Sequence, residues 1–313
     1  MCLTSVVLFP PDFPRFSEVR RNQVGLRVAI NEIANELAAR PACMSRTRSD
    51  KEMSEMPLVR FDNVVLRFGD TTILDGINLK IWIRDRLVIL GQSGSGKSTM
   101  LRLIVGILQP TSGAIFYKHC CIQCLSRNDL NLLRAQIGMV FQYSALISSM
   151  TVRENLALPL EELEEKSPEE IEAMVKEKLA LVGMSGTEDK FPAELSGGMR
   201  KRISLARALM MDPELILFDE PSAGLDPVAK SGIDELIIDL TEKKNVTSVI
   251  VTHEMDSAFR IATRMAMLYH GKIIQDDVPE KFKHSKNPIV HQFLTGELAG
   301  PITEMSNDPL VRK

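Results

Sequence analysis

Long apolar runs are absent from this 313-residue sequence. A helix needs about 18 or more consecutive apolar residues to cross a bilayer, and no stretch approaches that length. The best runs are strand-sized, such as Arg86–Leu90 and Thr247–Val251. If the protein works at a membrane, we therefore expect it to do so through a partner.

Cysteine is also scarce, with five residues in the chain. Three lie close together and two lie near the N-terminus: Cys120, Cys121 and Cys124, and Cys2 and Cys43. Five cysteines are too few and too clustered for a disulfide scaffold. Their odd number, without a clear secretion signal, indicates reduced thiols in a cytoplasm-like compartment. A zinc site on the clustered thiols would need a fourth ligand, such as the adjacent His119, but it lacks the usual two-pair spacing. Thiols beside a turn are the preferred interpretation.

The sequence has no large excess of charge, since 38 basic and 41 acidic side chains leave a net charge of −3. No basic block dominates any stretch, which argues against a nucleic-acid partner. The chain is 44% hydrophobic and 25% charged. That mixture is typical of a globular protein with a sizeable core.

The first 55 residues differ from the rest. They carry a short apolar patch at residues 6–9 and a predicted helix around Val24–Ala39, but the patch is too short and poorly placed for a secretory signal. Three methionines offer alternative starts just before the regular pattern begins: Met44, Met53 and Met56. We interpret residues 1–55 as a poorly ordered leader, either a targeting segment or an incorrectly assigned start.

From Leu58 onward the sequence predicts two kinds of strand. Period-2 alternation predicts antiparallel strands at Leu58–Phe61, Val64–Phe68 and Ile73–Ile83. Buried strands that alternate with helices are predicted at Leu87–Leu90, Leu215–Phe218 and Val249–Thr252. Such alternation indicates an α/β fold with a mainly parallel sheet covered on both faces. A hairpin at Met265–Gln275 follows.

These elements predict one domain over residues 56–284 and a C-terminal helical tail over residues 285–313. The section at about 144–198 is predicted to be helical, with a capping box that begins at Ser167. The short strand Leu87–Leu90 is predicted to run through a glycine-rich turn into the helix Thr99–Leu108.

That turn fits the phosphate-binding pattern Gly-x-x-x-x-Gly-Lys-Ser. Its residues, with the threonine that follows, are Gly91, Gln92, Ser93, Gly94, Ser95, Gly96, Lys97, Ser98 and Thr99. Glycines let main-chain N–H groups turn toward phosphates, and the helix N-terminus adds partial positive charge. We expect Lys97 to reach the β- and γ-phosphates and Ser98 to bind Mg²⁺. The flanking strand and helix argue against a simple Gly/Ser-rich linker.

A second segment, which is acidic, completes the predicted phosphate and metal site. The apolar run Leu215–Phe218 ends in two carboxylates, Asp219 and Glu220. We expect Asp219 to lie near the metal, directly or through a water. Glu220 is suited to polarise the attacking water. A solvated strand end is the alternative for this pair taken alone.

Four further motifs, in the same order along the chain, resemble those of the ABC family of ATPases. They are a Q-loop at Val140–Gln142, a signature at Leu195–Met199, a D-loop at Ser222–Asp226 and a switch histidine at Thr252–Glu254. Phe68 stands where that family places an aromatic that stacks on adenine. The resemblance covers about Val59 to His284 and departs at Met199, where most ABC signatures carry Gln.

The resemblance implies an α/β P-loop NTPase (RecA-like) core with an antiparallel β subdomain and a helical subdomain that carries the signature. It also implies ATP hydrolysis with Mg²⁺ in a homodimer that docks on an integral-membrane permease. In such a dimer Ser196, Gly197 and Gly198 would meet the γ-phosphate bound to the other subunit, and Asp226 belongs to the implied nucleotide-binding set.

Two side chains beyond the phosphate loop are given roles in hydrolysis by the same resemblance. Gln142 would touch the metal-bound water while its loop leans on the membrane partner. His253 would hold the attacking water or the developing charge. A histidine at a strand end near solvent is the alternative interpretation of His253.

The type of transporter is indicated by three segments that resemble ATPases of the Mla/MCE lipid-transport systems. They are Ser144–Leu160, the Met199 signature variant and the tail Asn287–Ile302. The resemblance implies a permease, an MCE-domain protein and phospholipid-like cargo. The location would be the cytoplasmic face of the inner membrane or, by the plastid counterpart, the stromal side of a plastid inner envelope. Alternatively, the tail is a capped helix that packs on its own domain.

Two other functions remain open. A polar-solute importer subunit would work with a soluble binding protein instead of an MCE protein. A non-transport ABC ATPase for DNA repair or translation would need long coiled coils or a second cassette, which the sequence lacks. A soluble kinase or GTPase would have no use for the Ser-Gly-Gly signature.

Overall fold

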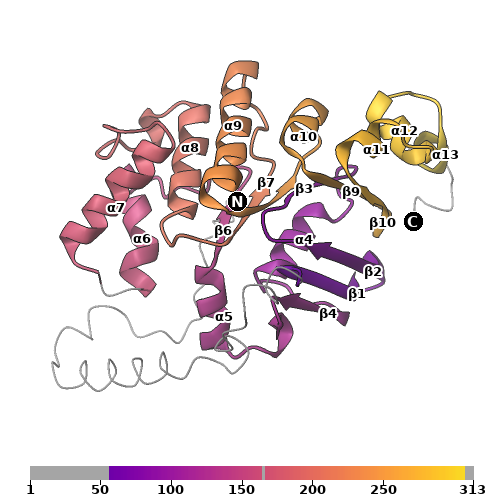
Figure 1. The fold of residues 1–313 in the computed structure, drawn as a ribbon, viewed down its shortest axis with the longest axis horizontal. Helices are drawn as coiled ribbons and strands as arrows, with labels where there is room; N and C mark the ends of the chain where they lie inside the picture. Colours follow the sequence, from indigo (N-terminus) through magenta and orange to yellow (C-terminus); the bar gives the residue numbers. More distant parts are fainter. Residues whose placement is uncertain (1–55, 164–165, 307–313) are drawn as a thin grey trace. The chain divides into compact units, whose positions relative to one another are not determined.

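The computed structural model describes residues 56–163 and 166–306, all within the unit that spans residues 48–313. The predictions for residues 1–55 and for the end of the tail, residues 307–313, lie outside the described residues. Figure 1 shows two β-sheets with helices packed around them. None of the described helices is long and apolar enough to span a membrane.

The first sheet is antiparallel and four-stranded, in the order β2-β1-β4-β5. Its strands are β1 (Val59–Phe68), β2 (Thr71–Ile81), β4 (Ser112–Tyr117) and β5 (Cys120–Cys121). Buried and exposed residues alternate along β1 because one face of the sheet packs inward and the other faces solvent. The two predicted segments at Leu58–Phe61 and Val64–Phe68 form this one strand, with shifts in register between Phe61 and Arg67.

The second sheet has six strands in the order β10-β9-β3-β8-β7-β6. They are β3 (Arg86–Leu90), β6 (Ile137–Val140), β7 (Leu215–Asp219), β8 (Thr247–Val251), β9 (Arg264–Tyr269) and β10 (Lys272–Asp277). All neighbours are parallel except β10, which pairs antiparallel with β9 through the predicted hairpin. Every residue of β7 and β8 is buried, as expected for central strands covered on both faces. The predicted α/β fold class is confirmed.

The helices connect and cover these strands. They are α4 (Lys97–Ile104), α5 (Arg127–Ala135), α6 (Val152–Leu163), α7 (Pro168–Leu181), α8 (Gly197–Ala208), α9 (Pro227–Lys244), α10 (Met255–Ile261), α11 (Pro279–Lys283), α12 (Pro288–Thr295) and α13 (Pro301–Ser306). Two 3₁₀ turns, η1 (Ile122–Cys124) and η2 (Pro192–Glu194), join them. Helix α7 begins with the predicted capping box, in which Ser167 and Glu170 bond reciprocally. Helix α4 lies between the sheets, against β4 and β7.

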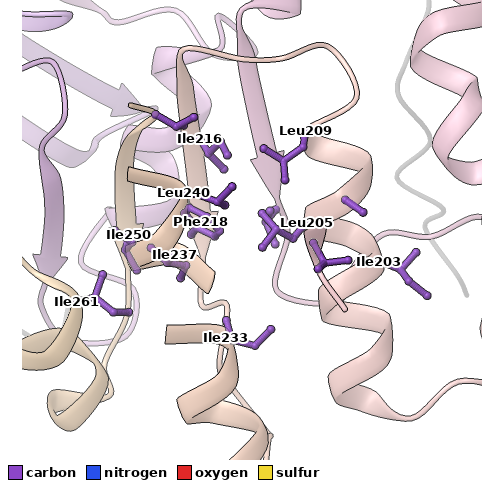
Figure 2. Packing of buried hydrophobic residues seen from close by; sticks show 14 of the residues in the cluster. Ile203, Leu205, Leu209, Ile216, Phe218, Ile233, Ile237, Leu240, Ile250 and Ile261 are labelled. Carbon is purple, nitrogen blue, oxygen red and sulfur yellow. The ribbon is translucent and has the colours of Figure 1, made fainter. Parts of the chain in front are cut away.

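The main core lies between the second sheet and the helices α8 and α9. Figure 2 shows side chains of β7 and β8, such as Phe218 and Ile250, facing Leu205 of α8 and Ile237 of α9, and all four are almost fully buried. Each such side chain contributes about 1.5–3 kcal/mol by leaving water. This packing fixes α8 beside the carboxyl ends of β6 and β7.

The C-terminal tail folds onto its own chain as far as it is described. Asn287 caps α12, and Val290 is fully buried while Ile289, Phe293 and Leu294 pack against the main core. Buried Gln292 then binds α13: its Oε1 accepts from the Ile302 N–H at 2.8 Å and its Nε2 donates to the Glu297 carbonyl at 3.1 Å.

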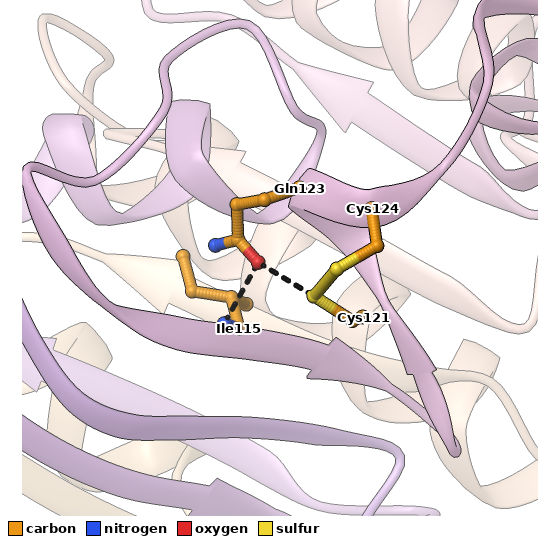
Figure 3. The surroundings of a disulfide bond; sticks show 4 residues. All are labelled: Ile115, Cys121, Gln123 and Cys124. Atoms are coloured by element: carbon orange, nitrogen blue, oxygen red, sulfur yellow. Dashed lines mark hydrogen bonds between the residues drawn. A yellow bond between two sulfur atoms is a disulfide. The ribbon is translucent and has the colours of Figure 1, made fainter.

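Two of the clustered cysteines depart from the expectation of reduced thiols. Cys121 and Cys124 form a disulfide between β5 and η1, with Cα atoms 5.3 Å apart (Figure 3). The turn of η1 places residues three apart in sequence on the same side of the chain. The resulting distance between the two Cα atoms is within the range that a disulfide spans. Gln123 lies beside the bridge, and its Oε1 accepts from the Ile115 N–H at 3.2 Å. The bridge uses two of the three thiols that a zinc site would require.

Candidate active site

The glycine-rich turn after β3 leads directly into α4, which begins at Lys97 instead of the predicted Thr99. Gly91 has φ of 153°, and a Cβ there would lie 2.3 Å from the Leu268 carbonyl oxygen of β9. Only glycine therefore lets the turn pass this close to the neighbouring strand. Gly96 caps α4 without any side-chain bond, so the first N–H groups of the helix have no acceptor in the cap.

Lys97 and Ser98 point into the turn from the start of α4. Lys97 is buried, and its Nζ donates to the carbonyls of Gly91 and Gln92 at 2.8 Å each. Burial lowers the pKa of Lys97, although the charges of Glu220 and Asp219 oppose this. The buried hydroxyl of Ser95 has no hydrogen-bond partner among the described residues. The turn thus offers unused donors to an anion.

Asp219 and Glu220 lie at the carboxyl end of β7, facing this turn. Ser98 Oγ donates to Asp219 Oδ1 at 2.7 Å, which joins the end of β7 to the start of α4. Both residues are 9% exposed. A hydroxyl and a carboxylate oxygen side by side are the hard ligands that Mg²⁺ prefers.

Glu220 and His253 are held together at the same edge of the sheet. His253 follows β8, and its Nδ1 lies 2.9 Å from Glu220 Oε1. Glu220 Oε2 is buried and has no hydrogen-bond partner among the described residues. The Glu220 backbone has φ of 51°, a conformation that costs a non-glycine residue about 1–3 kcal/mol. One carboxylate oxygen is therefore oriented by histidine and the other is available as an acceptor.

The loop after β6, residues 141–145, reaches this edge because β6 pairs with β7 and Val140 lies beside Phe218. The Gln142 side chain is exposed, whereas its carbonyl accepts a hydrogen bond from Lys201 Nζ of α8. The same ammonium donates to the Glu220 carbonyl at 3.2 Å. Gln142 therefore joins the cluster through its main chain.

The remaining predicted site residues lie apart from the phosphate turn. Ser196 caps α8 by accepting from the Met199 N–H at 3.2 Å, and in the described structure no hydrogen bond joins it, Gly197 or Gly198 to that turn. Asp226 caps α9, accepting from the N–H groups of residues 228 and 229 at 3.0 Å each. Phe68 ends β1 and is 53% exposed.

The sequence reasoning missed Lys201, which is only 6% exposed. Lys201 is the middle residue of the basic run at residues 200–202, which follows the signature. A run of three basic residues gives no sign that the middle one is buried. A usable signal was the helical spacing of three polar side chains, Lys201, Ser204 and Arg207, on one face of a helix.

Comparisons with known proteins agree with this geometry. Residues 74–223 match the family described as ABC transporter. The chain is 41% identical over 244 residues to the probable ribonucleotide transport ATP-binding protein mkl of Mycobacterium bovis, covering 78% of this chain and 68% of the relative. It is 38% identical over 262 residues to the chloroplastic protein TRIGALACTOSYLDIACYLGLYCEROL 3 of Arabidopsis thaliana, covering 78% and 75%. A methionine import ATP-binding protein, MetN 1 of Yersinia pestis, is 39% identical over 255 residues, covering 79% and 74%.

A solved structure shares the fold. The dimeric post-hydrolysis state of the ATP-binding cassette MJ0796, bound to ADP and Pi, superposes with a TM-score of 0.65 and 32% identity, covering 71% of this chain and 98% of that one. The phosphate turn, the paired carboxylates and these relatives lead to one conclusion: the chain belongs to the ABC transporter ATP-binding family and is an ATPase subunit of that kind.

Proposed function

We propose that the cluster at the ends of β3, β7 and β8 hydrolyses ATP by in-line attack of water. The turn Gly91–Ser98 would hold the phosphates with its main-chain N–H groups and Lys97, and Thr99 lies in the same first turn of α4. Phe68 would stack on the adenine, for which its exposure leaves room. The N–H groups at the start of α4, which have no side-chain acceptor in the cap, and the Ser95 hydroxyl, which has no hydrogen-bond partner among the described residues, support the assignment of this turn to the phosphates.

The Ser98 hydroxyl and the Asp219 carboxylate fit Mg²⁺ because they lie 2.7 Å apart and are both oxygen ligands. Gln142 is the third residue proposed to hold the ion, through a water. When bound, Mg²⁺ supplies positive charge that neutralises the phosphate oxygens. Lys97, whose ammonium lies in the same turn, adds a second positive charge.

Glu220 is proposed as the acceptor of the water proton, and the observation that carries this role is its asymmetric carboxylate. Oε1 is oriented by His253 at 2.9 Å, while Oε2 is buried without a partner among the described residues. A fixed carboxylate with one unused oxygen is suited to general-base catalysis. His253 would keep that carboxylate aligned and contact the developing charge.

The active form is proposed to be a homodimer in which each signature completes the other chain's site. Ser196 and Gly197 are exposed at the N-terminus of α8, which is an anion-binding end of a helix. They make no hydrogen bond to their own chain's phosphate turn in the described structure. The dimeric state of the similar cassette MJ0796 supports the proposal. Asp226 lies on the same segment as Glu220 and would join the dimer contact.

The cargo is proposed to be a phospholipid-class molecule, moved through a separate permease that works with an MCE-domain partner. The ATPase subunit would lie at the cytoplasmic face of an inner membrane or at the stromal side of a plastid inner envelope. The names of the relatives divide between a ribonucleotide, methionine and a lipid. The lipid choice is supported by the tail Asn287–Ile302 and Met199, which resemble the Mla/MCE systems. A polar-solute importer is the competing function, supported by the methionine import relative.

One experiment tests this choice. The tagged chain is extracted gently from its native membranes, and the proteins and lipids that co-purify are identified by mass spectrometry. A permease, an MCE-domain protein and bound phospholipid support the lipid proposal. A permease that co-purifies with a soluble solute receptor, and without an MCE-domain protein, refutes it and leaves the ATPase assignment intact.

A further inference from the structure

One face of α8 holds the loop after β6 by its main chain. Lys201, Ser204 and Arg207 are spaced three residues apart, which places them along the same side of the helix. Ser204 Oγ donates to the Ser144 carbonyl at 2.9 Å, and Arg207 donates to the Ala145 carbonyl at 2.8 Å. Lys201 Nζ donates to the Gln142 carbonyl. Because all three bonds end on carbonyl oxygens, they fix the path of the loop whatever side chains it carries.

Lys201 differs from Ser204 and Arg207 because it also contacts the segment that follows β7. Its Nζ donates to the Glu220 carbonyl at 3.2 Å, and the side chain is 6% exposed. Among the described residues, the hydrogen bonds of the Ser204 and Arg207 side chains end on the Ser144 and Ala145 carbonyls and not on the segment that follows β7. One buried ammonium therefore bridges the Gln142 loop and the Glu220 peptide, and burying it would be costly without such acceptors.

The Glu220 peptide is a strained part of the site. Its φ of 51° is unfavourable for a residue with a side chain. Its N–H donates to the Val251 carbonyl at 2.9 Å, and its carbonyl accepts from Lys201 Nζ at 3.2 Å and from the Ala223 N–H at 3.3 Å. If the Lys201 bond is lost, the carbonyl keeps only the Ala223 N–H within its own turn, and no bond then ties it to α8. The strained peptide can then shift, which moves its carboxylate relative to His253. A displacement of about 1 Å in a reacting group can reduce the rate about 100-fold.

We propose that Lys201 is a positioning residue for ATP hydrolysis: it makes the alignment of the Glu220 carboxylate depend on the position of residues 142–145. This inference rests on the role proposed for Glu220. Since Lys201 Nζ is engaged by the carbonyls of Gln142 and Glu220, we expect its loss to act on turnover and to leave ATP binding in place.

The test compares variants of the full chain by steady-state hydrolysis and by amide hydrogen exchange. Lys201→Met keeps the length of the side chain and removes its donors, and we expect kcat to fall about 10-fold with the ATP KM within about 2-fold. Lys201→Arg restores two donors and should recover most of kcat. Ser204→Ala is the matched control, because it removes one bond to the loop and none to Glu220, and its kcat should stay within about 3-fold.

Exchange gives the readout that a general loss of stability would not. The amides of residues 219–223 should exchange faster in Lys201→Met than in the parent, whereas those of β8 should not. If Lys201→Met does not fold, Lys201→Gln, which keeps a shorter donor, should give an intermediate kcat. Parent-level kcat in the variant that folds, or a loss confined to KM, overturns the proposal. A Glu220→Gln chain that hydrolyses ATP at the parent rate would instead refute the proposed role of Glu220, so the two failures are distinguishable.

Discussion

Glu220 shows how the site is built at the scale of single residues. Its backbone has φ of 51°, one carboxylate oxygen lies 2.9 Å from His253, and the other is buried without a partner among the described residues. The strained backbone and the unpaired oxygen are unfavourable for stability, whereas the contact with His253 orients the carboxylate. Together they place an aligned acceptor beside the phosphate turn, which is what proton transfer from water requires.

Replacing Glu220 with Gln should stop turnover and preserve binding. The amide keeps the shape and one hydrogen bond but cannot accept a proton, so phosphate release at saturating ATP should fall by about 100-fold or more. Equilibrium binding of a fluorescent ATP analogue should change little. Glu254→Gln is the matched control, since Glu254 lies at the same edge but pairs with Lys230 at 2.6 Å. Hydrolysis at the parent rate in Glu220→Gln would contradict the role given to Glu220.

The sequence predicts the residues of this site better than their connections. The phosphate turn and the Asp219–Glu220 pair are local patterns whose strand and helix context is readable from neighbouring residues. The bond between Lys201 and Glu220 joins positions 19 residues apart. Such a bond depends on how α8 packs against the sheet, and hydrophobic periodicity gives the face of a helix but not its neighbours.

At the scale of elements, the pair α12 and α13 illustrates packing around one polar side chain. Gln292 binds the N–H of Ile302 and the carbonyl of Glu297, and a Cβ at Gly300 would lie 2.6 Å from it. A buried amide with both ends bonded fixes the loop between the two helices. The sequence predicts the cap and apolar face of α12, but the polar link is a tertiary contact without a local signal.

Gln292→Ala should release this loop and spare catalysis. Loss of bonds worth about 1 kcal/mol each should speed amide exchange at residues 297–303 by about 10-fold. ATP hydrolysis should remain within about 2-fold, because no residue assigned to the site lies in the tail. His291→Ala, at an exposed position of the same helix, should leave both measurements unchanged. Parent-like exchange in Gln292→Ala would show that the apolar face of α12 alone holds the tail.

At the scale of the whole molecule, the feature of interest is the signature segment, which makes no hydrogen bond to the phosphate turn of its own chain in the described structure. Gly197 is the first residue of α8 and is exposed, and a Cβ there would lie 3.6 Å from Leu225 at its nearest contact. There is therefore room for a side chain. An acidic residue at a helix N-terminus is favourable to the helix but repels a phosphate.

Gly197→Asp should consequently fold well and fail to dimerise with ATP. In a Glu220→Gln background, where ATP persists, size-exclusion chromatography should give a dimer with ATP and Mg²⁺. Adding Gly197→Asp should return the chain to a monomer, with ATP binding to the monomer reduced by less than about 3-fold. A dimer that persists in the double variant would mean that the signature does not contact the partner's nucleotide.

The bridge between Cys121 and Cys124 has a consequence for how copies of this protein behave when crowded. Strand β5 forms one edge of the antiparallel sheet and is two residues long, and the bridge spans the 3₁₀ turn η1 that follows it. An unpaired sheet edge is a template on which a strand of another molecule can add. A foreign strand that adds to β5 would find only two residues of backbone before the bridged turn. The bridged turn thereby limits the length of strand that β5 itself can offer to another molecule.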